Sequence, residues 1–269
     1  MKMGKRKSEP GKPARTGTAE EDERRYLEEY RPEAFPRPSV TVDLVVFTVI
    51  DKQLHVLLVR RGEPPFKGSW ALPGGFVRVS EDRNDQGEDL DAAAHRELLE
   101  ETGLSHSASA GVFLEQVRTF GRPGRDPRMR VISIAYYALV RPTLVPHIVA
   151  GGDVTHTKWF DVHALLSSER PGPSGLAFDH AEILETALER MRAELDRSSI
   201  GFELVAETFT IQELRAVHEA IRGESLDPGN FRKRFLRLLE DGVIEPARGK
   251  RPTASKPANV YRFVRPPKR

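Results

Sequence analysis

The sequence of 269 residues contains no cysteine. This absence excludes a disulfide framework, a thiolate nucleophile and a thiolate-bound zinc ion. The sequence also lacks an apolar run of the roughly 20 residues that a membrane-spanning helix needs, and no apolar core follows its basic N-terminus. We therefore expect no membrane span and no signal peptide. Together these absences favour a cytoplasmic protein made of ordinary globular domains.

The first part of the chain is rich in predicted strands. The apolar runs Thr41–Ile50 and Leu54–Arg60 are β-branched and are separated by the polar residues 51–53, which predicts a hairpin. A helix is predicted over 179–197, with Asp179 at its N-cap position. Further strands are predicted at 112–118, 131–140 and 157–160, and a further helix at 88–102.

The composition changes after the stretch SSERPGPSG, where we place a domain boundary. Residues 210–221 predict a helix with a capping box formed by Thr210 and Glu213. A basic helix over 227–242, a loop rich in Gly, Pro, Lys and Arg, and a final strand follow. Helix, short connection, basic helix, basic loop and strand is the order of a winged helix-turn-helix.

Positive charge is concentrated in this last part of the chain. From 225 to 269 the sequence has 12 Lys and Arg against 4 acidic residues. Arginine and lysine recognise phosphates and guanine, and asparagine recognises adenine, so we expect the second helix to enter a DNA groove. The alternatives are a solvated basic helix and an RNA-binding surface. The candidate DNA-binding residues are Asn230, Arg232, Lys233, Arg234, Arg237, Lys250 and Arg251.

Three glutamates stand on one face of the predicted helix at 88–102. Glu97, Glu100 and Glu101 have the spacing i, i+3 and i+4, so their carboxylates project within one turn. Like charges so placed repel one another unless a cation neutralises them, and Mg²⁺ or Mn²⁺ prefers such oxygen ligands. Arg96 lies four residues before Glu100 and eight after Glu88, so it can pair with both. The alternative is an ordinary solvated acidic helix.

Residues 96–104 read R-E-L-L-E-E-T-G-L and, with Glu88, resemble the second half of the Nudix hydrolase box. The first half departs from that pattern. Position 82, where the leading Gly of the box would fall, is Asp, and the pair Gly74–Gly75 stands seven residues earlier than the pattern requires. We interpret this as an insertion around 81–87. It leaves the glutamate helix whole but alters the loop before it.

The resemblance implies an α/β/α sandwich around a mixed sheet. It also implies that Mg²⁺ or Mn²⁺ binds to Glu97, Glu100 and Glu101, near the backbone carbonyl of Gly75, and that a pyrophosphate bond is attacked by water. The catalytic candidates are Arg96, Glu97, Glu100 and Glu101, and the ligand-binding candidates are Arg60, Gly75, Phe120, Arg125 and Arg128. Arg61, Arg122 and Arg130 are further candidates for a diphosphate, and Asp153 for an additional acid. The alternative for 120–130 is a solvated hairpin loop with Phe120 in the core.

The whole chain has a narrower resemblance, carried by YRPEAFPRPSVTVD, LHVLLVRRGEPPFKGSWALPGGFV, FDHAEILETALERMR and a YRF near the end. These segments resemble the Nudix-related transcriptional regulators of NAD metabolism. The resemblance implies a dimeric repressor that leaves its DNA operator when it binds ADP-ribose or a related NAD-derived nucleotide. Retained hydrolysis stays open. The alternative is a pyrophosphatase of ADP-ribose or another nucleoside diphosphate sugar whose C-terminal module does not bind DNA.

We therefore predict an α/β protein in three parts. Residues 1–30 form a disordered basic tail, 31–170 a Nudix α/β/α sandwich with a mixed sheet, and 171–269 a winged helix-turn-helix domain.

Overall fold

The computed structural model describes residues 18–80, 86–104, 112–148, 156–167, 176–253 and 256–264. They belong to two units, divided between Arg37 and Pro38, which are described separately. The first unit holds helix α1 (Ala19–Glu29), which begins with a capping box between Thr18 and Glu21, and the short helix η1 (Pro32–Ala34). Residues 19–29, placed in the tail from the sequence, are thus helical.

A mixed sheet forms the centre of the second unit. Strand β1 (Ser39–Ile50) runs parallel to β6 (Val131–Leu139) and antiparallel to β2 (Gln53–Arg60), which confirms the predicted hairpin. The strand order is β3-β2-β1-β6-β5, with β4 also pairing with β1 and β7 with β2. The remaining strands are β3 (Trp70–Ala71), β4 (Gly74–Phe76), β5 (Phe113–Phe120) and β7 (Thr157–Asp161).

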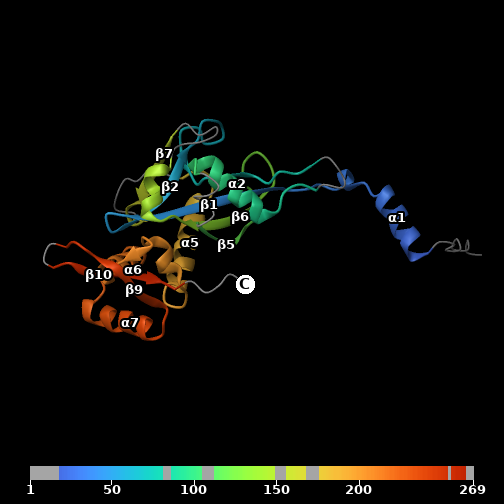
Figure 1. Ribbon diagram of the computed structural model, residues 1–269. Helices are drawn as coiled ribbons and strands as arrows, with labels where there is room; N and C mark the ends of the chain where they lie inside the picture. The colour runs from blue at the N-terminus through green and yellow to red at the C-terminus, as the bar shows by residue number, and fades with distance from the viewer. Residues whose placement is uncertain are drawn as a thin grey trace, which may run out of the picture. The chain divides into compact units, whose positions relative to one another are not determined.

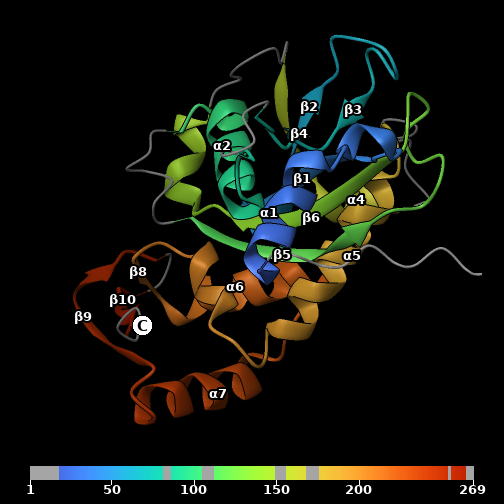
Figure 2. The same cartoon turned by 90° about the vertical axis from the view of Figure 1, so that its right-hand side faces the viewer.

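Helices cover both faces of this sheet, because successive side chains of a strand point to opposite sides. Val42, Leu44 and Val46 of β1 pack in one buried cluster with helix α2 (Leu90–Thr102). Val45 and Phe47 belong to the cluster on the other face, together with helix α5 (His180–Glu194). The predicted α/β/α sandwich with a mixed sheet is confirmed (Figure 2). The short helices η2 (Pro142–His147) and α4 (Val162–Leu166) follow β6 and β7.

The C-terminal part is a winged helix. Helix α6 (Ile211–Arg222) has the predicted capping box of Thr210 and Glu213 and ends at Gly223, whose φ of 77° is left-handed. Helix α7 (Pro228–Glu240) follows and is capped by Asp227. A small antiparallel sheet lies beside them (Figure 1), in the order β8-β10-β9. Its strands are β8 (Thr208–Phe209), β9 (Ile244–Arg251) and β10 (Ala258–Phe263), and helix η3 (Ile200–Leu204) precedes them.

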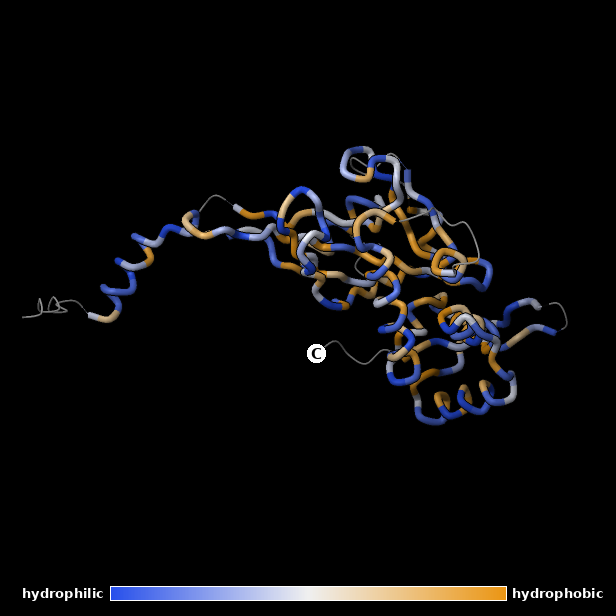
Figure 3. Tube along the Cα trace, turned by 180° about the vertical axis from the view of Figure 1, so that it is seen from behind, coloured by the Kyte–Doolittle hydropathy of each residue, from blue (hydrophilic) through white to orange (hydrophobic). Residues whose placement is uncertain are grey.

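One buried apolar cluster joins the sheet to the winged helix. It runs from Phe47 of β1 through Leu188 of α5 to Leu214 of α6 and Phe231 of α7. In Figure 3 the strands of the central sheet are mainly orange, whereas α7 alternates orange and blue. The predicted boundary at 170 falls among residues 168–175, outside the described residues. Within the described parts of the chain, no helix is long and apolar enough to cross a membrane.

Candidate functional site

The glutamate motif lies on helix α2. Asp89 caps the start of the helix through the amide of Asp91, and Gly103 ends it in the left-handed conformation, with φ of 64°. Leu98 and Leu104 are buried against the sheet, which fixes the rotation of the helix. As a result Glu97 is only 6% exposed, whereas Glu100 lies at the surface. The three glutamates therefore have different surroundings.

Arg96 connects the acids of this site. Its guanidinium donates to Glu88 (Nη2 to Oε1, 2.5 Å), Glu97 (Nη1 to Oε1, 2.6 Å) and Glu100 (Nη1 to Oε2, 3.0 Å). The predicted pairing of Arg96 with Glu88 and Glu100 is confirmed. The hydrogen bond from Arg96 lowers the pKa of Glu88 to about 2. Glu88 also accepts from the amide of Arg78, which closes the loop that contains the inferred insertion.

Glycine at position 75 makes room for the carboxylate of Glu97. A Cβ atom at this position would overlap the carboxylate oxygens of Glu97. The close approach and the burial desolvate that carboxylate, which raises the pKa of Glu97 despite the hydrogen bond from Arg96. Gly75 lies on β4, held by its antiparallel pairing with β1. The fold thus brings the buried acid Glu97 against the backbone of β4.

These donors match a divalent cation in chemistry. Carboxylate oxygens are the ligands that Mg²⁺ and Mn²⁺ prefer, and the missing side chain of Gly75 lets the Glu97 carboxylate lie against the backbone of β4. In the residues that the structure describes, no three acidic or histidine side chains converge closely enough to surround an ion. Arg96 instead lies between Glu97 and Glu100. The carboxylates of α2 are thus suitable ligands for Mg²⁺ or Mn²⁺, but in this conformation they form ion pairs with Arg96.

A cavity of about 190 Å³ adjoins Gly75. Its wall carries two arginines and two aromatic rings that face one another. The guanidinium of Arg61 lies 4.8 Å from the ring centroid of Phe178, and that of Arg128 lies 5.6 Å from the ring of Phe76. Arginines recognise phosphate and aromatic rings stack on bases, so this wall suits a nucleotide.

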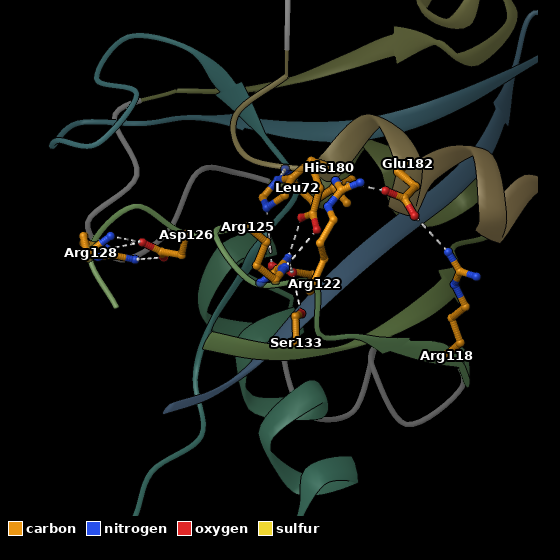
Figure 4. A network of polar contacts seen from close by, with 11 residues as sticks. Leu72, Arg118, Arg122, Arg125, Asp126, Arg128, Ser133, His180 and Glu182 are labelled. Carbon is orange, nitrogen blue, oxygen red and sulfur yellow. Dashed lines mark hydrogen bonds and ion pairs between the residues drawn. The ribbon is translucent and has the colours of Figure 1, made fainter. Parts of the chain in front are cut away.

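The cavity floor is a buried network of charges (Figure 4). Arg125 forms a two-pronged pair with Asp179 (2.6 and 2.9 Å) and also contacts Asp43 (3.2 Å). Ser133 donates to Asp43 over 2.5 Å. His180 accepts from the amide of Leu72 through Nδ1 (2.8 Å), and its burial lowers its pKa. The imidazole is therefore neutral, with its proton on Nε2, which faces Asp43 at 3.6 Å.

Helix α7 presents part of its basic face to solvent. Asn230, Arg232, Lys233 and Arg237 are exposed, as is Lys250 on β9. Two of the other predicted DNA contacts already have partners inside the protein. Arg234 pairs with Asp196, and Arg251 pairs with Glu213 over 2.6 and 2.7 Å and reaches the carbonyl of Thr208.

The NUDIX domain pattern matches residues 40–186, more than half of the sequence. The chain belongs to the Nudix family. Its residues 201–263 match the NrtR DNA-binding winged helix domain, so this Nudix chain carries the winged helix that the order of its C-terminal elements predicts.

This Nudix chain is similar to a regulator and to an enzyme. It is 34% identical over 242 residues to the ADPR responsive transcriptional repressor NtrR of Acinetobacter baylyi, covering 90% of this chain and 88% of that one. It is 34% identical over 162 residues to the ADP-ribose pyrophosphatase of Methanocaldococcus jannaschii, covering 60% and 79%. The structure of Shewanella oneidensis NrtR complexed with a 27mer DNA superposes with a TM-score of 0.67, at 31% identity, over 84% of this chain and 93% of that one.

The predicted ligand contacts of the Nudix part have different locations. Gly75 and Arg128 line the cavity, and Arg125 lies in its floor with its side chain 4% exposed. Phe120 is buried, and the guanidinium of Arg118 covers its ring at 4.5 Å. Arg60 donates from Nε to the carbonyl of Gly68 (3.2 Å). The proposed additional acid, Asp153, lies outside the described residues.

Other residues of the cavity were not singled out from the sequence. Phe178 and His180 precede and begin α5, far along the chain from the Nudix box. Asp43 looks like an interruption of an apolar strand, although it is a buried partner of Arg125. An acid inside a strand that is otherwise apolar is the signal that could have identified it. The N-cap position of Asp179 is as predicted, but no capping bond forms, because Arg125 holds its carboxylate.

Proposed function

We propose that this protein is a DNA-binding transcriptional repressor whose Nudix domain senses ADP-ribose or a related NAD-derived nucleotide. The single observation that carries this proposal is a cavity wall of arginines and aromatic rings beside a complete R-E-x-x-E-E helix, in one chain with a basic winged helix. The similarity to the repressor NtrR over nearly the whole length supports the same assignment.

The ligand would bind between the Nudix helix and the cavity wall. Arg61 and Arg128 would pair with the diphosphate, and Phe178 or Phe76 would stack on the adenine. A Mg²⁺ or Mn²⁺ ion would be held by Glu97, Glu100 and Glu101, and when bound it would neutralise the charge of the diphosphate. Arg125 would stabilise the cavity floor through its hydrogen bonds to Asp43 and Asp179.

Hydrolysis of ADP-ribose is the second candidate function. Arg96 orients two of the glutamates at 2.6 and 3.0 Å, and the similarity to an ADP-ribose pyrophosphatase covers the Nudix part. Release of AMP that depends on Mg²⁺ and disappears in Glu100→Gln would establish this activity. If the wild-type protein does not hydrolyse ADP-ribose, the hydrolase function is rejected, whereas the proposed sensor function stands.

DNA binding is assigned to α7 and the wing. Arg232, Lys233 and Arg237 are exposed on α7 and would enter the major groove, while Lys250 of β9 would meet phosphates. We infer that the protein acts as a homodimer on a palindrome whose half-sites lie about one helical turn apart. The DNA partner also implies a cytoplasmic location.

An electrophoretic shift with DNA from upstream of the neighbouring genes tests the proposal. We expect a complex that weakens with salt and dissociates when ADP-ribose is added with Mg²⁺, but not when NAD is added. The variant Arg232→Glu/Lys233→Glu/Arg237→Glu removes exposed charge from α7 and should abolish the shift. A shift that persists in this variant, or a preference for single-stranded RNA over the duplex, would contradict the assignment of α7.

A further inference from the structure

Helix α5 begins in the wall of the nucleotide cavity. Phe178, which precedes it, lines the cavity and has a φ of 53°, a left-handed conformation that is unfavourable for an aromatic residue. The next residue, Asp179, is held by Arg125, and His180 is held by the amide of Leu72. The position of the first turn of α5 is therefore set by contacts with the cavity floor.

The other end of α5 reaches the winged helix. Arg192 in its last turn donates to the carbonyls of Ile221 (3.0 Å) and Arg222 (3.1 Å) at the end of α6. Just beyond the helix, Asp196 pairs with Arg222 at 2.5 Å and with Arg234 of α7. Arg234 also donates to the carbonyl of Leu195 (3.3 Å). One carboxylate thus links the end of α5 to both helices of the DNA-binding domain.

The middle of α5 is well suited to transmit a movement. Ile183, Leu184, Ala187 and Met191 are fully buried, and they pack in the cluster that runs from the sheet to α7. A helix of 15 residues is about 22 Å long, and protein interiors are packed too densely for one end to move freely while the other stays fixed. A displacement of the first turn of α5 would therefore also displace Asp196, which follows the helix.

An anionic ligand would act directly on the first turn. Two of the arginines that line the cavity are already paired with acids, in the pairs Arg128–Asp126 (2.8 Å) and Arg125–Asp179 (2.6 Å). A diphosphate that binds here competes with these carboxylates for the guanidinium groups, and a base that stacks on Phe178 displaces a residue next to Asp179. Both effects change how α5 is held at its start.

We propose that α5 couples the nucleotide cavity to the DNA-binding surface, and that Asp196 is the positioning residue that fixes Arg234, and with it α7, at the far end. This inference rests on the proposed function of the Nudix domain as a sensor. Ligand binding shifts α5, the Asp196–Arg234 contact changes, and α7 leaves the orientation that fits DNA. Asp196 touches neither the nucleotide cavity nor, in this scheme, the DNA.

The test is the ratio of DNA affinities without and with ADP-ribose. For the wild-type protein we expect ADP-ribose with Mg²⁺ to weaken DNA binding by a factor on the order of 10, which is typical of allosteric coupling. In Asp196→Asn we expect that factor to fall to about 2 or less, while the affinity for ADP-ribose in calorimetry without DNA stays unchanged. Asp196→Glu keeps the charge and should recover most of the ratio.

A matched control is Glu189→Gln, which removes the same charge from an exposed position of α5. It should keep the wild-type ratio. If Asp196→Asn keeps the wild-type ratio of DNA affinities without and with ADP-ribose, the role of Asp196 is overturned, although the sensor function stands. A wild-type protein without any effect of ADP-ribose on DNA binding would overturn both proposals.

Hydrogen exchange gives a second measurement that does not depend on variants. ADP-ribose added to the wild-type protein should change the exchange of the amides at 195–199, which follow α5. Unchanged exchange there, at a concentration that saturates the Nudix domain, would overturn the coupling even if Asp196→Asn fails to fold.

Discussion

Arg125 and Asp179 form a two-pronged ion pair in which both side chains are almost fully buried, at 4% and 5% exposure. The guanidinium comes from the loop between β5 and β6, and the carboxylate from the start of α5, 54 residues further along the chain. The pair joins two segments that have no backbone contact in the sheet. It therefore does two things at once, since it forms the cavity floor and anchors α5.

Removal of this guanidinium should be costly. Arg125→Met leaves Asp43 and Asp179 close together without their cation, and loss of one partner from a buried pair costs about 3–5 kcal/mol. The free energy of unfolding from urea titration should fall by this amount. Arg122→Met is the matched control, because Arg122 is 68% exposed and pairs with Glu182 at the surface. Equal stability of the two variants would refute the anchoring role.

Gly75→Ala should disturb Glu97 more than the fold. The added Cβ overlaps the Glu97 carboxylate, which must move away from Arg96, and such overpacking costs about 1–3 kcal/mol. We expect weaker Mn²⁺ and ADP-ribose binding, measured by electron paramagnetic resonance and by calorimetry. Gly121→Ala is the control, since a Cβ there would meet its nearest neighbour at 3.9 Å. If Gly75→Ala binds Mn²⁺ with the affinity of the wild-type protein, Glu97 is not a ligand of the metal.

The basic residues of α7 should differ in their effect on the stability of the protein. Lys233→Ala and Arg237→Ala remove exposed charges, so each should reduce the slope of log affinity against log salt by about 1 without changing the melting temperature. Arg234→Ala should in addition lower the melting temperature, because it leaves Asp196 with a single partner. Identical melting temperatures for all three variants would show that the Asp196–Arg234 contact adds no stability.

His218 should make stability depend on pH. Its side chain is buried in α6, and burial, with the nearby Arg234 cation, lowers its pKa from 6.5 to about 4. The unfolded chain therefore binds more protons between these values, and stability falls as the pH drops from 6.5 to 4. A shift of this size corresponds to about 3 kcal/mol.

His218→Phe, which keeps a ring beside Phe231, should remove this contribution. The difference in unfolding free energy between wild type and variant should be constant above pH 6.5 and change below it. Among the described residues His180 is also a buried histidine, but it is present in both proteins, so its contribution cancels from the difference. A difference that is the same at pH 7 and pH 4.5 would refute the lowered pKa.

The sequence predicted the parts of the site that are local. Arg96 and its glutamates lie within a few residues of one another, so helical geometry alone brings them together. The winged helix was predictable for the same reason, because caps and apolar spacing mark its helices. Phe178 and Asp43 come from distant segments, and only the packing of α5 on the sheet brings them to one cavity. Their placement depends on tertiary contacts that no local pattern encodes.

The same limit applies to the charged residues. Arg234 and Arg237 lie three positions apart on α7 and look equivalent in the sequence. Asp196, 38 residues before Arg234, gives only one of them a partner. Likewise Arg125 and Arg128 belong to one Arg-rich loop, yet the first is buried in the floor and the second is 40% exposed.

The continuous apolar interior between the central sheet and α7 restricts how a new operator preference can evolve. A winged helix taken from another protein would place side chains of different shape against α5. We therefore expect that the winged helix cannot be replaced without destabilising the Nudix domain. Phe231 and Phe235 are committed to the inside of the molecule. We therefore expect changes in DNA sequence preference to arise at the outward positions of α7 and of the wing, which lie outside this apolar cluster.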